Sequence, residues 1–406
     1  MPLLRRILWL ALATGAAQAQ AQAGDEPWYA GGSLGLTRID NLYRVSDADT
    51  ENSDTVRSAT LLAGVQARLG RHRWKLDTRV SQNDYQRNSD LRNLSYSATT
   101  SWDWASGSRL SGQVLLGSQR SLAPFNPGNA PVTNQKNIER SDRARVYARY
   151  GLAGLWAVDG SVGANRRDYS LALYDRYDYS QRNADIGLRY QPSPPLGLRL
   201  ASRHSRGSYP RHTVTGVGSF QADRFSRQDL DASLTWTPGP EHQVSLRVSD
   251  GHSRHTEAAA RDYRGRSGQL STTWAPTSKL LFQAQLSRDT GDDSRLVDQG
   301  QFGSINSSNS RSYDSLQLQA VYSLTAKVTL DASLTQLRRE LVDQFGLLSA
   351  TGRDRSDSAS LGARWAFDRN GLLSCQLSTD RRTGAAGFSL PFSASSTGCS
   401  LQYMLR

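Results

Sequence analysis

The residue types most often used in catalysis and metal binding are few and scattered in this chain. The six histidines fall in expected turns, loops and strand ends: His72, His204, His212, His242, His252 and His255. Only His252 and His255 are close, and on a strand their i, i+3 spacing puts the two rings on opposite faces. No G-x-S-x-G, H-E-x-x-H or C-x-x-C pattern and no glycine-rich phosphate loop occurs. We therefore expect no metal, no cofactor and no enzymatic activity, although a triad of Ser, His and Asp assembled only in space stays open.

Arginine is the residue type whose pattern points to a function. The chain has 49 basic residues, nearly all Arg, against 37 acidic ones, and a guanidinium group donates paired hydrogen bonds to carboxylates. Ten basic residues lie on the polar faces of expected strands and are candidates for the lining of a pore: Arg68, Lys75, Arg79, Arg145, Arg149, Arg189, Arg199, Arg203, Arg247 and Arg364. Four obvious acids lie among them: Asp77, Asp185, Asp231 and Asp331. These arginines either line a path for an anionic or hydroxyl-rich solute, or pair with neighbouring carboxylates and hold a wall together.

The elements that must position these side chains are strands of alternating polarity. In the segment 230–236, Leu, Ala, Leu and Trp alternate with Asp, Ser and Thr, and segments 316–324, 328–335 and 359–367 follow the same rule. Because successive side chains of a strand point to opposite faces, each segment has one apolar and one polar face. No part of the chain after the first 23 residues has a persuasive helical period.

Short turns and longer polar connections alternate strictly along the chain. Eight short turns fall near residues 70–71, 105–107, 151–154, 191–195, 238–241, 276–278, 325–326 and 369–370. Nine long connections fall near 44–55, 86–92, 122–140, 171–176, 210–222, 256–261, 292–310, 341–353 and 384–393. Together they join eighteen strands, or sixteen if one hairpin is misplaced. An even number of strands with both chain ends on the short-turn side is typical of bacterial transmembrane barrels.

The tryptophans support the same architecture. Eight of them lie within a few residues of the short turns: Trp28, Trp74, Trp102, Trp104, Trp156, Trp236, Trp274 and Trp365. A ring of aromatic residues at one level is typical of a membrane–water boundary. The sequence therefore predicts an all-β fold, a transmembrane antiparallel β-barrel in a Gram-negative outer membrane. Its short turns would be periplasmic and its long loops extracellular.

The start of the chain is typical of an exported protein. Arg5 and Arg6 precede a short apolar run and a small-residue cleavage region, so we expect a signal peptide at residues 1–23 and the barrel at 24–406. Removing the two arginines changes the net charge from +12 to +10. Export argues against a nucleic-acid partner as the explanation of this charge, and a basic lumen or contact with anionic lipopolysaccharide explains it better.

Two cysteines occur near the end of the chain, which suits one disulfide in an oxidising compartment. Cys375 and Cys399 each lie on the apolar face of an expected strand, and one hairpin loop lies between them with Gly387 at its midpoint. They are therefore expected to be cross-strand neighbours. They either form a disulfide or remain two small apolar side chains facing lipid.

Short motifs, mainly in the first half of the chain, resemble one family of bacterial barrels. The residues Asp40-Asn41-Leu42-Tyr43-Arg44 are similar to a D-D-N-L-[FY]-R opening, and Ser53-Asp54-Thr55-Val56-Arg57 to the S-D-T-x-R that follows it. Both are typical of the EpsL-like outer-membrane barrels of exopolysaccharide loci, which are associated with exosortase/PEP-CTERM systems and belong to a wider group of β-barrel porins. The likeness continues at 73–77, 102–104, 109–112 and 207–210.

The chain departs from this pattern in two places. Ile39 stands where the opening motif has its first Asp, and the last residues are Tyr403-Met404-Leu405-Arg406, without the terminal Phe common in such barrels. What the resemblance implies is a non-enzymatic channel or accessory component in exopolysaccharide biosynthesis and export, with polysaccharide and periplasmic export proteins as partners. It implies no catalytic residue.

The residues alone leave two further functions open. A general or sugar- or anion-selective diffusion porin has the same strand signature, and an outer-membrane lipid-modifying enzyme is disfavoured because no histidine has a clear partner. In each case the surrounding partners would be outer-membrane lipid and lipopolysaccharide. The arginine-rich polar faces predict a pore that prefers anions.

Overall fold

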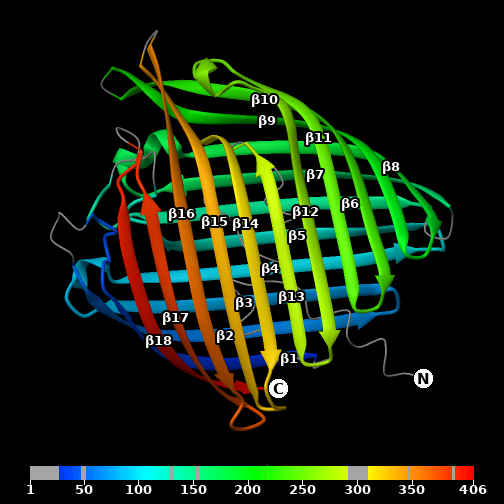
Figure 1. The fold of residues 1–406 in the computed structure, drawn as a ribbon, viewed down its shortest axis with the longest axis horizontal. Coiled ribbons are helices and arrows are strands. Elements are labelled where there is room, and N and C mark those ends of the chain that lie inside the picture. Colours follow the sequence, from blue (N-terminus) through cyan, green and yellow to red (C-terminus); the bar gives the residue numbers. More distant parts are fainter. Residues whose placement is uncertain are drawn as a thin grey trace.

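The computed structural model describes residues 27–46, 52–127, 132–151, 155–216, 218–290, 310–345, 348–385 and 389–406, and the expected signal peptide lies outside these ranges. Eighteen antiparallel strands form a single sheet: β1 Trp28–Ile39, β2 Asp54–Leu69, β3 His72–Tyr85, β4 Asn93–Ser106, β5 Leu110–Leu122, β6 Ile138–Tyr150, β7 Trp156–Tyr169, β8 Tyr179–Ser193, β9 Leu196–Gly216, β10 Ser219–Gly239, β11 His242–His255, β12 Tyr263–Thr277, β13 Leu280–Asp289, β14 Ser310–Ser323, β15 Val328–Phe345, β16 Leu348–Trp365, β17 Gly371–Thr383 and β18 Phe392–Leu405. Each strand pairs with the next, and β18 pairs back onto β1. The sheet is therefore a closed barrel, and the predicted eighteen strands are confirmed (Figure 1).

The barrel has its apolar side chains outside and its polar ones inside. Leu34 and Leu61 on the outer face are 68% and 71% exposed, whereas Arg203 and Asp231 on the inner face are each 6% exposed. This arrangement is the reverse of a water-soluble protein, and it follows from the two-residue period of each strand. An apolar outer band around a polar interior is the surface that a bilayer requires.

The two ends of the barrel differ. All eight predicted short turns join neighbouring strands at one end, and the start of β1 and the end of β18 lie at that end, where Ala30 pairs with Leu405 (Figure 1). Gly70 and Gly107 adopt positive φ in two of these turns, which glycine tolerates without strain. Trp74 stacks on Trp102 across β3 and β4 near this end, with ring centroids 4.7 Å apart. The tryptophans thus lie at one level, as predicted.

The prediction of a long loop is wrong at two places. Residues 210–222 and 341–353 were expected to be connections, but β9 and β10 continue to Gly216 and Ser219, and β15 and β16 continue to Phe345 and Leu348. These hairpins extend past the apolar band, so neither face of the strands needs to be apolar and the alternating pattern disappears. The connection predicted at 292–310 lies outside the described residues apart from Ser310.

Three of the remaining long connections contain a short helical turn. The 3₁₀ helices η2 Ser89–Leu91, η3 Ala172–Tyr177 and η4 Ala259–Arg261 lie after β3, β7 and β11. Within the described ranges no helix is long and apolar enough to cross a membrane.

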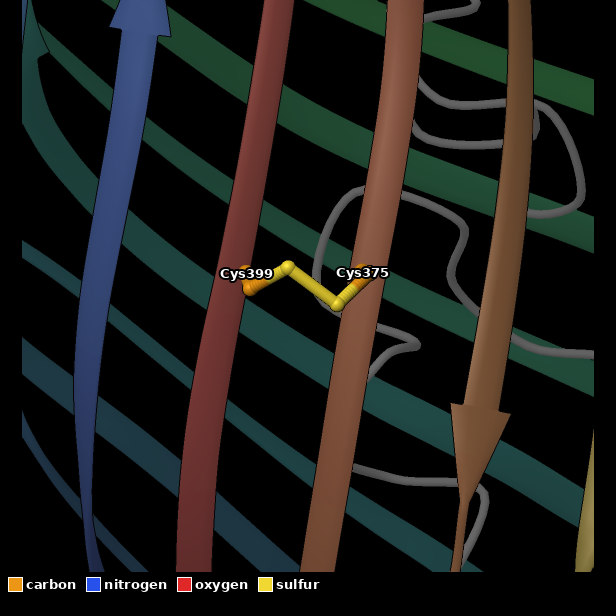
Figure 2. Close-up of a disulfide and its surroundings, with 2 residues drawn as sticks. All are labelled: Cys375 and Cys399. Atoms are coloured by element: carbon orange, nitrogen blue, oxygen red, sulfur yellow. A yellow bond between two sulfur atoms is a disulfide. The ribbon is translucent and has the colours of Figure 1, made fainter.

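Cys375 and Cys399 are joined by a disulfide between β17 and β18 (Figure 2). The two residues stand directly opposite each other in the strand register, with their Cα atoms 4.1 Å apart. Their side chains lie on the outer face of the barrel together with Leu377 and Leu401, which are both exposed. Of the two alternatives left by the sequence, the structure has the bonded one.

Candidate functional site: the barrel interior and its mouth

All ten candidate basic residues lie at strand positions whose side chains face the barrel interior. The register shows this directly, because Lys75 opposes Ser101 and Arg203 opposes both Asp185 and Asp229, away from the exposed leucines of the same strands. The full set is Arg68, Lys75, Arg79, Arg145, Arg149, Arg189, Arg199, Arg203, Arg247 and Arg364. The four acids predicted with them face inward as well.

The interior carries more charge than the sequence suggested. Six further arginines face inward: Arg73, Arg143, Arg167, Arg227, Arg339 and Arg382. Nine further acids do so too: Asp54, Asp103, Glu139, Asp159, Asp223, Asp229, Asp289, Asp354 and Asp380. The expected ratio of ten basic side chains to about four acids is therefore wrong. The same two-residue period could have assigned most of them, but many lie near strand ends, where the pattern is weakest.

The deeper half of one wall is held by shared carboxylates. Asp159 on β7 accepts hydrogen bonds from Arg189 and Arg199, at 3.2 Å and 2.6 Å, and its side chain is fully buried. Arg199 also donates to Asp185 on β8. Three adjacent strands are thus joined through charged groups that would cost several kcal/mol if they were buried without partners.

A second cluster continues this wall toward the long loops. Arg203 on β9 pairs with Asp229 and Asp231 on β10, at 3.2 Å and 3.1 Å. Arg227 pairs with Asp229 at 2.9 Å and with Asp289 of β13 at 3.0 Å. All five side chains are buried, and Ser249 donates a further hydrogen bond to Asp231. The arginines on β8–β10 therefore hold the wall together, as one of the two interpretations of the sequence proposed.

The wall formed by β2–β6 is different. Arg68, Arg79 and Arg143 have no hydrogen bond or ion pair with any residue that the structure describes, and Arg68 and Arg143 are exposed. Lys75 pairs with Asp77 at 3.2 Å, but both side chains remain partly exposed. Because no described residue satisfies the donors of Arg68, Arg79 and Arg143, their guanidinium groups are available to water and to solutes.

The remaining candidates lie between these extremes. Arg145 lies over the ring of Tyr147, Arg247 donates to Gln269 at 3.2 Å, and Arg364 pairs with Asp331 at 3.2 Å. Arg149 opposes Asp159 in the register, but its buried Nε has no hydrogen-bond partner among the described residues.

The β5–β6 connection crosses the mouth of the barrel. The backbone oxygen of Pro127 accepts a hydrogen bond from Arg339 of β15 at 3.2 Å, and Asn126 Oδ1 accepts one from Arg382 of β17 at 2.9 Å. In a ring of eighteen strands, β6 and β15 lie on opposite sides. Arg339 is itself fixed by Asp354, to which it donates two hydrogen bonds. The connection is thus anchored to the far wall by buried charged residues.

Other loops pack against this crossing segment. Phe125 forms a small buried cluster with Leu42 of the β1–β2 connection and Leu91 of η2. Asn126 Nδ2 donates to the backbone oxygen of Arg44 at 2.7 Å. Arg44 in turn pairs with Asp380 at 3.1 Å. The residues of the Asp40–Arg44 motif therefore organise the mouth of the barrel.

One histidine has a carboxylate partner that the sequence did not reveal. His255 Nδ1 lies 2.7 Å from Asp223 Oδ2, and the Asp223 carboxylate also accepts hydrogen bonds from the backbone N–H groups of Glu257 and Ala258. Both side chains of the pair are fully buried, so a substrate has no access to them and the pair fixes the start of the β11–β12 connection. In the part of the chain that the structure covers, no group of three or more His, Cys, Asp or Glu could hold a metal ion.

Comparisons with known proteins find similarity only in solved structures. No family model matches the sequence, and no curated protein matches it. The chain is similar to Pseudomonas aeruginosa OccK2 (OpdF) in complex with glucuronate, with 13% identity, 93% of this chain and 98% of that chain covered, and a TM-score of 0.48. It is similar to the FrpB iron transporter of Neisseria meningitidis (10% identity, 96% and 84% covered, TM-score 0.48) and to a BenF-like porin of Pseudomonas fluorescens (12%, 94% and 99%, 0.45). The resemblance to exopolysaccharide-locus barrels gains no support from these comparisons.

Proposed function

We propose that this protein is a non-enzymatic diffusion channel of the Gram-negative outer membrane and that it favours small anionic solutes. The observation that carries the proposal is that three arginines on the inner wall of β2–β6, Arg68, Arg79 and Arg143, have no partner among the described residues of a closed barrel. Barrels of sixteen to eighteen strands are wide enough to leave an aqueous channel. Guanidinium groups on its wall attract anions, an effect that extends about 8 Å at physiological salt.

The mouth of the barrel favours small solutes over a polymer. The β5–β6 connection, held by Arg339 and Arg382, divides the entrance between two opposite walls. Export of exopolysaccharide, which the motif resemblance implies, is for this reason the less favoured function. We take the short-turn end, where β1 starts and β18 ends, to be periplasmic and the loop end to be extracellular, which is the usual orientation of such barrels.

The reversal potential of the purified protein tests this proposal. In a bilayer of neutral lipid under a KCl gradient, the expected sign is that of an anion-preferring pore, and the preference should weaken as the salt concentration rises. A cation-preferring pore, or a barrel that conducts no ions, would overturn the proposal. Deleting the gene should leave secreted exopolysaccharide unchanged, and a loss of secretion would return polymer export to first place.

A further inference from the structure

The outer face of the barrel changes character on the way to the long loops. On β9 the outward positions change from Leu198 and Leu200 to Ser202, His204 and Arg206, and on β11 they change from Val248 to Asp250, His252 and Arg254. A strand advances about 3.3 Å per residue, so the charged positions begin directly above the apolar band. This is the level at which the headgroups of surrounding lipids lie.

The register gathers the charged positions of β8–β12 into one surface. Arg182 of β8 directly opposes Arg206 of β9. Ser226 of β10 opposes Arg206 on one side and Arg254 of β11 on the other, and His252 of β11 opposes Arg264 of β12. We call this surface the outer basic patch. It consists of Arg182, Arg206, Arg224, Arg254, Arg264 and Arg266 with His204 and His252, and all of these except the half-buried His204 are exposed. The only acid at an outward strand position within it is Asp250, 4.0 Å from Arg266.

Outward arginines elsewhere at this level are of two kinds. Arg38, Arg57, Arg120 and Arg338 have no carboxylate partner among the described residues, whereas four others do. Arg140 pairs with Asp142, Arg166 with Asp168, Arg288 with Asp314 and Arg355 with Asp357, at distances of 2.7–3.8 Å. In the outer basic patch, Arg182, Arg224, Arg254 and Arg264 have no carboxylate partner among the described residues either, and they lie together on neighbouring strands. Like charges directly opposite each other in a sheet repel. Because Arg182 and Arg206 stand in that relation, an external anion would stabilise this surface.

The patch is also hollowed. The outward residues His252, Arg254 and Arg264 line a depression of about 550 Å³ between β11 and β12, together with Asp250 and Asp262. The two carboxylates have other partners, since Asp250 lies by Arg266 and Asp262 accepts a hydrogen bond from the backbone N–H of His255. Arg254 and Arg264 can therefore donate paired hydrogen bonds to a phosphate group in the depression.

We propose that the outer basic patch binds the phosphate groups of an anionic lipid in the outer leaflet, and that this lipid is phosphorylated lipid A. The inference rests on the proposed membrane orientation, and it concerns the outer face of the barrel rather than its channel. Each cation close to an anionic lipid surface strengthens the attraction. Several arginines on one face of the barrel should therefore bind a lipid with two or more phosphate groups more tightly than a lipid with one.

Binding of bisphosphorylated lipid A to the purified barrel in neutral detergent tests the proposal. The variant Arg182→Gln/Arg206→Gln/Arg254→Gln/Arg264→Gln should bind at least tenfold more weakly than the natural protein. The matched control Arg140→Gln/Arg166→Gln/Arg288→Gln/Arg355→Gln removes four arginines from the same level, all of them paired, and should bind within twofold. Lipid A without phosphate groups should bind as weakly as the patch variant. Equal binding by the patch variant, equal loss in the control, or undiminished binding of dephosphorylated lipid A would each overturn the proposal.

Two further measurements keep the test decisive. If the fourfold variant does not fold, as judged by heat-modifiable migration, Arg182→Gln alone serves, and it should weaken lipid binding about threefold while leaving the barrel at least as heat-stable in neutral detergent, since a repulsive pair is removed. A loss of stability without lipid would contradict the like-charge argument. Displacement of lipid A by millimolar inorganic phosphate alone would show a site for free phosphate and not for lipid. Ion selectivity should be unchanged in the patch variant, which separates this proposal from that for the channel.

Discussion

The two sides of the barrel interior use the same residue type in opposite ways. On β7–β11, six inward basic residues face five acids, and Arg189, Arg199, Arg203 and Arg227 are paired with carboxylates that join neighbouring strands. On β2–β6, seven basic residues (Arg68, Arg73, Lys75, Arg79, Arg143, Arg145 and Arg149) face four acids (Asp54, Asp77, Asp103 and Glu139), and three of the arginines have no described partner.

This difference shows that the number of arginines does not by itself indicate a binding surface. A buried guanidinium group must be paired with a carboxylate, because an unpaired buried charge is very costly. An exposed one can remain solvated and act on solutes. The β7–β11 wall is therefore primarily structural, while the β2–β6 wall gives the interior its available positive charge.

The largest expected effect is on the structural wall. Asp229→Asn keeps the shape of the side chain but leaves Arg203 and Arg227 without their shared carboxylate, so the free energy of unfolding should fall by about 3–5 kcal/mol. The matched control is Arg79→Gln on the other wall, which should change the free energy of unfolding by about 0.5 kcal/mol or less. Urea unfolding in detergent, followed by tryptophan fluorescence, measures both. Similar losses in the two variants would show that the walls do not differ.

The next effect concerns the segment that joins the two sides at the mouth. Asn126→Ala removes the hydrogen bonds to Arg382 and to the backbone oxygen of Arg44, which together contribute about 2 kcal/mol to the position of the β5–β6 connection. Single-channel conductance should rise, and the connection should become sensitive to protease. Gln135→Ala, an exposed position on the same connection, is the control. Unchanged conductance in Asn126→Ala would mean that the segment does not narrow the path.

Ion selectivity distinguishes the walls more finely. Arg68→Gln/Arg79→Gln/Arg143→Gln should leave the barrel folded and move the ratio of anion to cation permeability about twofold toward one, since each charge acts on solutes only within about 8 Å. The corresponding changes at Arg189, Arg199, Arg203 and Arg247 should first reduce stability, because three of these are paired with buried carboxylates and the fourth bonds Gln269. Reversal potentials under a salt gradient provide the measurement. Loss of selectivity only in the second set would reverse the assignment of the walls.

Much of this architecture could be predicted from the sequence because alternation is a local property. Within the apolar band most inward residues have at least one apolar neighbour at an outward position, so Arg79, next to Val80, and Arg189, next to Leu188, are assigned to the interior by their own strands. Beyond the band both faces meet water, and the sequence gives no sign that residues 210–222 and 341–353 continue as strands. Partners are equally invisible. Arg339 and Pro127 are 212 positions apart, and only barrel closure brings them together.

The smallest expected effect concerns the buried carboxylate of Asp223. Asp223 lies on β10 seven positions before Leu230 in the sequence, on the loop side of the apolar band. Its carboxylate accepts hydrogen bonds from His255 and from the backbone N–H of Glu257 and so fixes the β11–β12 connection. Burial alone would raise the pKa of Asp223, but hydrogen bonds from His255 and from the backbone N–H of Glu257 outweigh burial and lower the pKa to about 2. The stability that this carboxylate contributes is thus complete above its ordinary pKa of 3.8 and is lost as the pH falls toward about 2.

The expected result is a local opening of residues 256–262 between pH 4 and pH 2, with the rest of the barrel intact. Hydrogen exchange of that segment, corrected for the intrinsic rate at each pH, should show protection at pH 5 that is lost at pH 2. Asp223→Asn should lack this protection already at pH 5, because a neutral amide accepts weaker hydrogen bonds than a carboxylate. Glu257→Gln, at an exposed side chain, should behave as the natural protein does. Full protection of the segment at pH 2 in the natural protein would show that packing at the mouth, and not the charge of Asp223, fixes this connection.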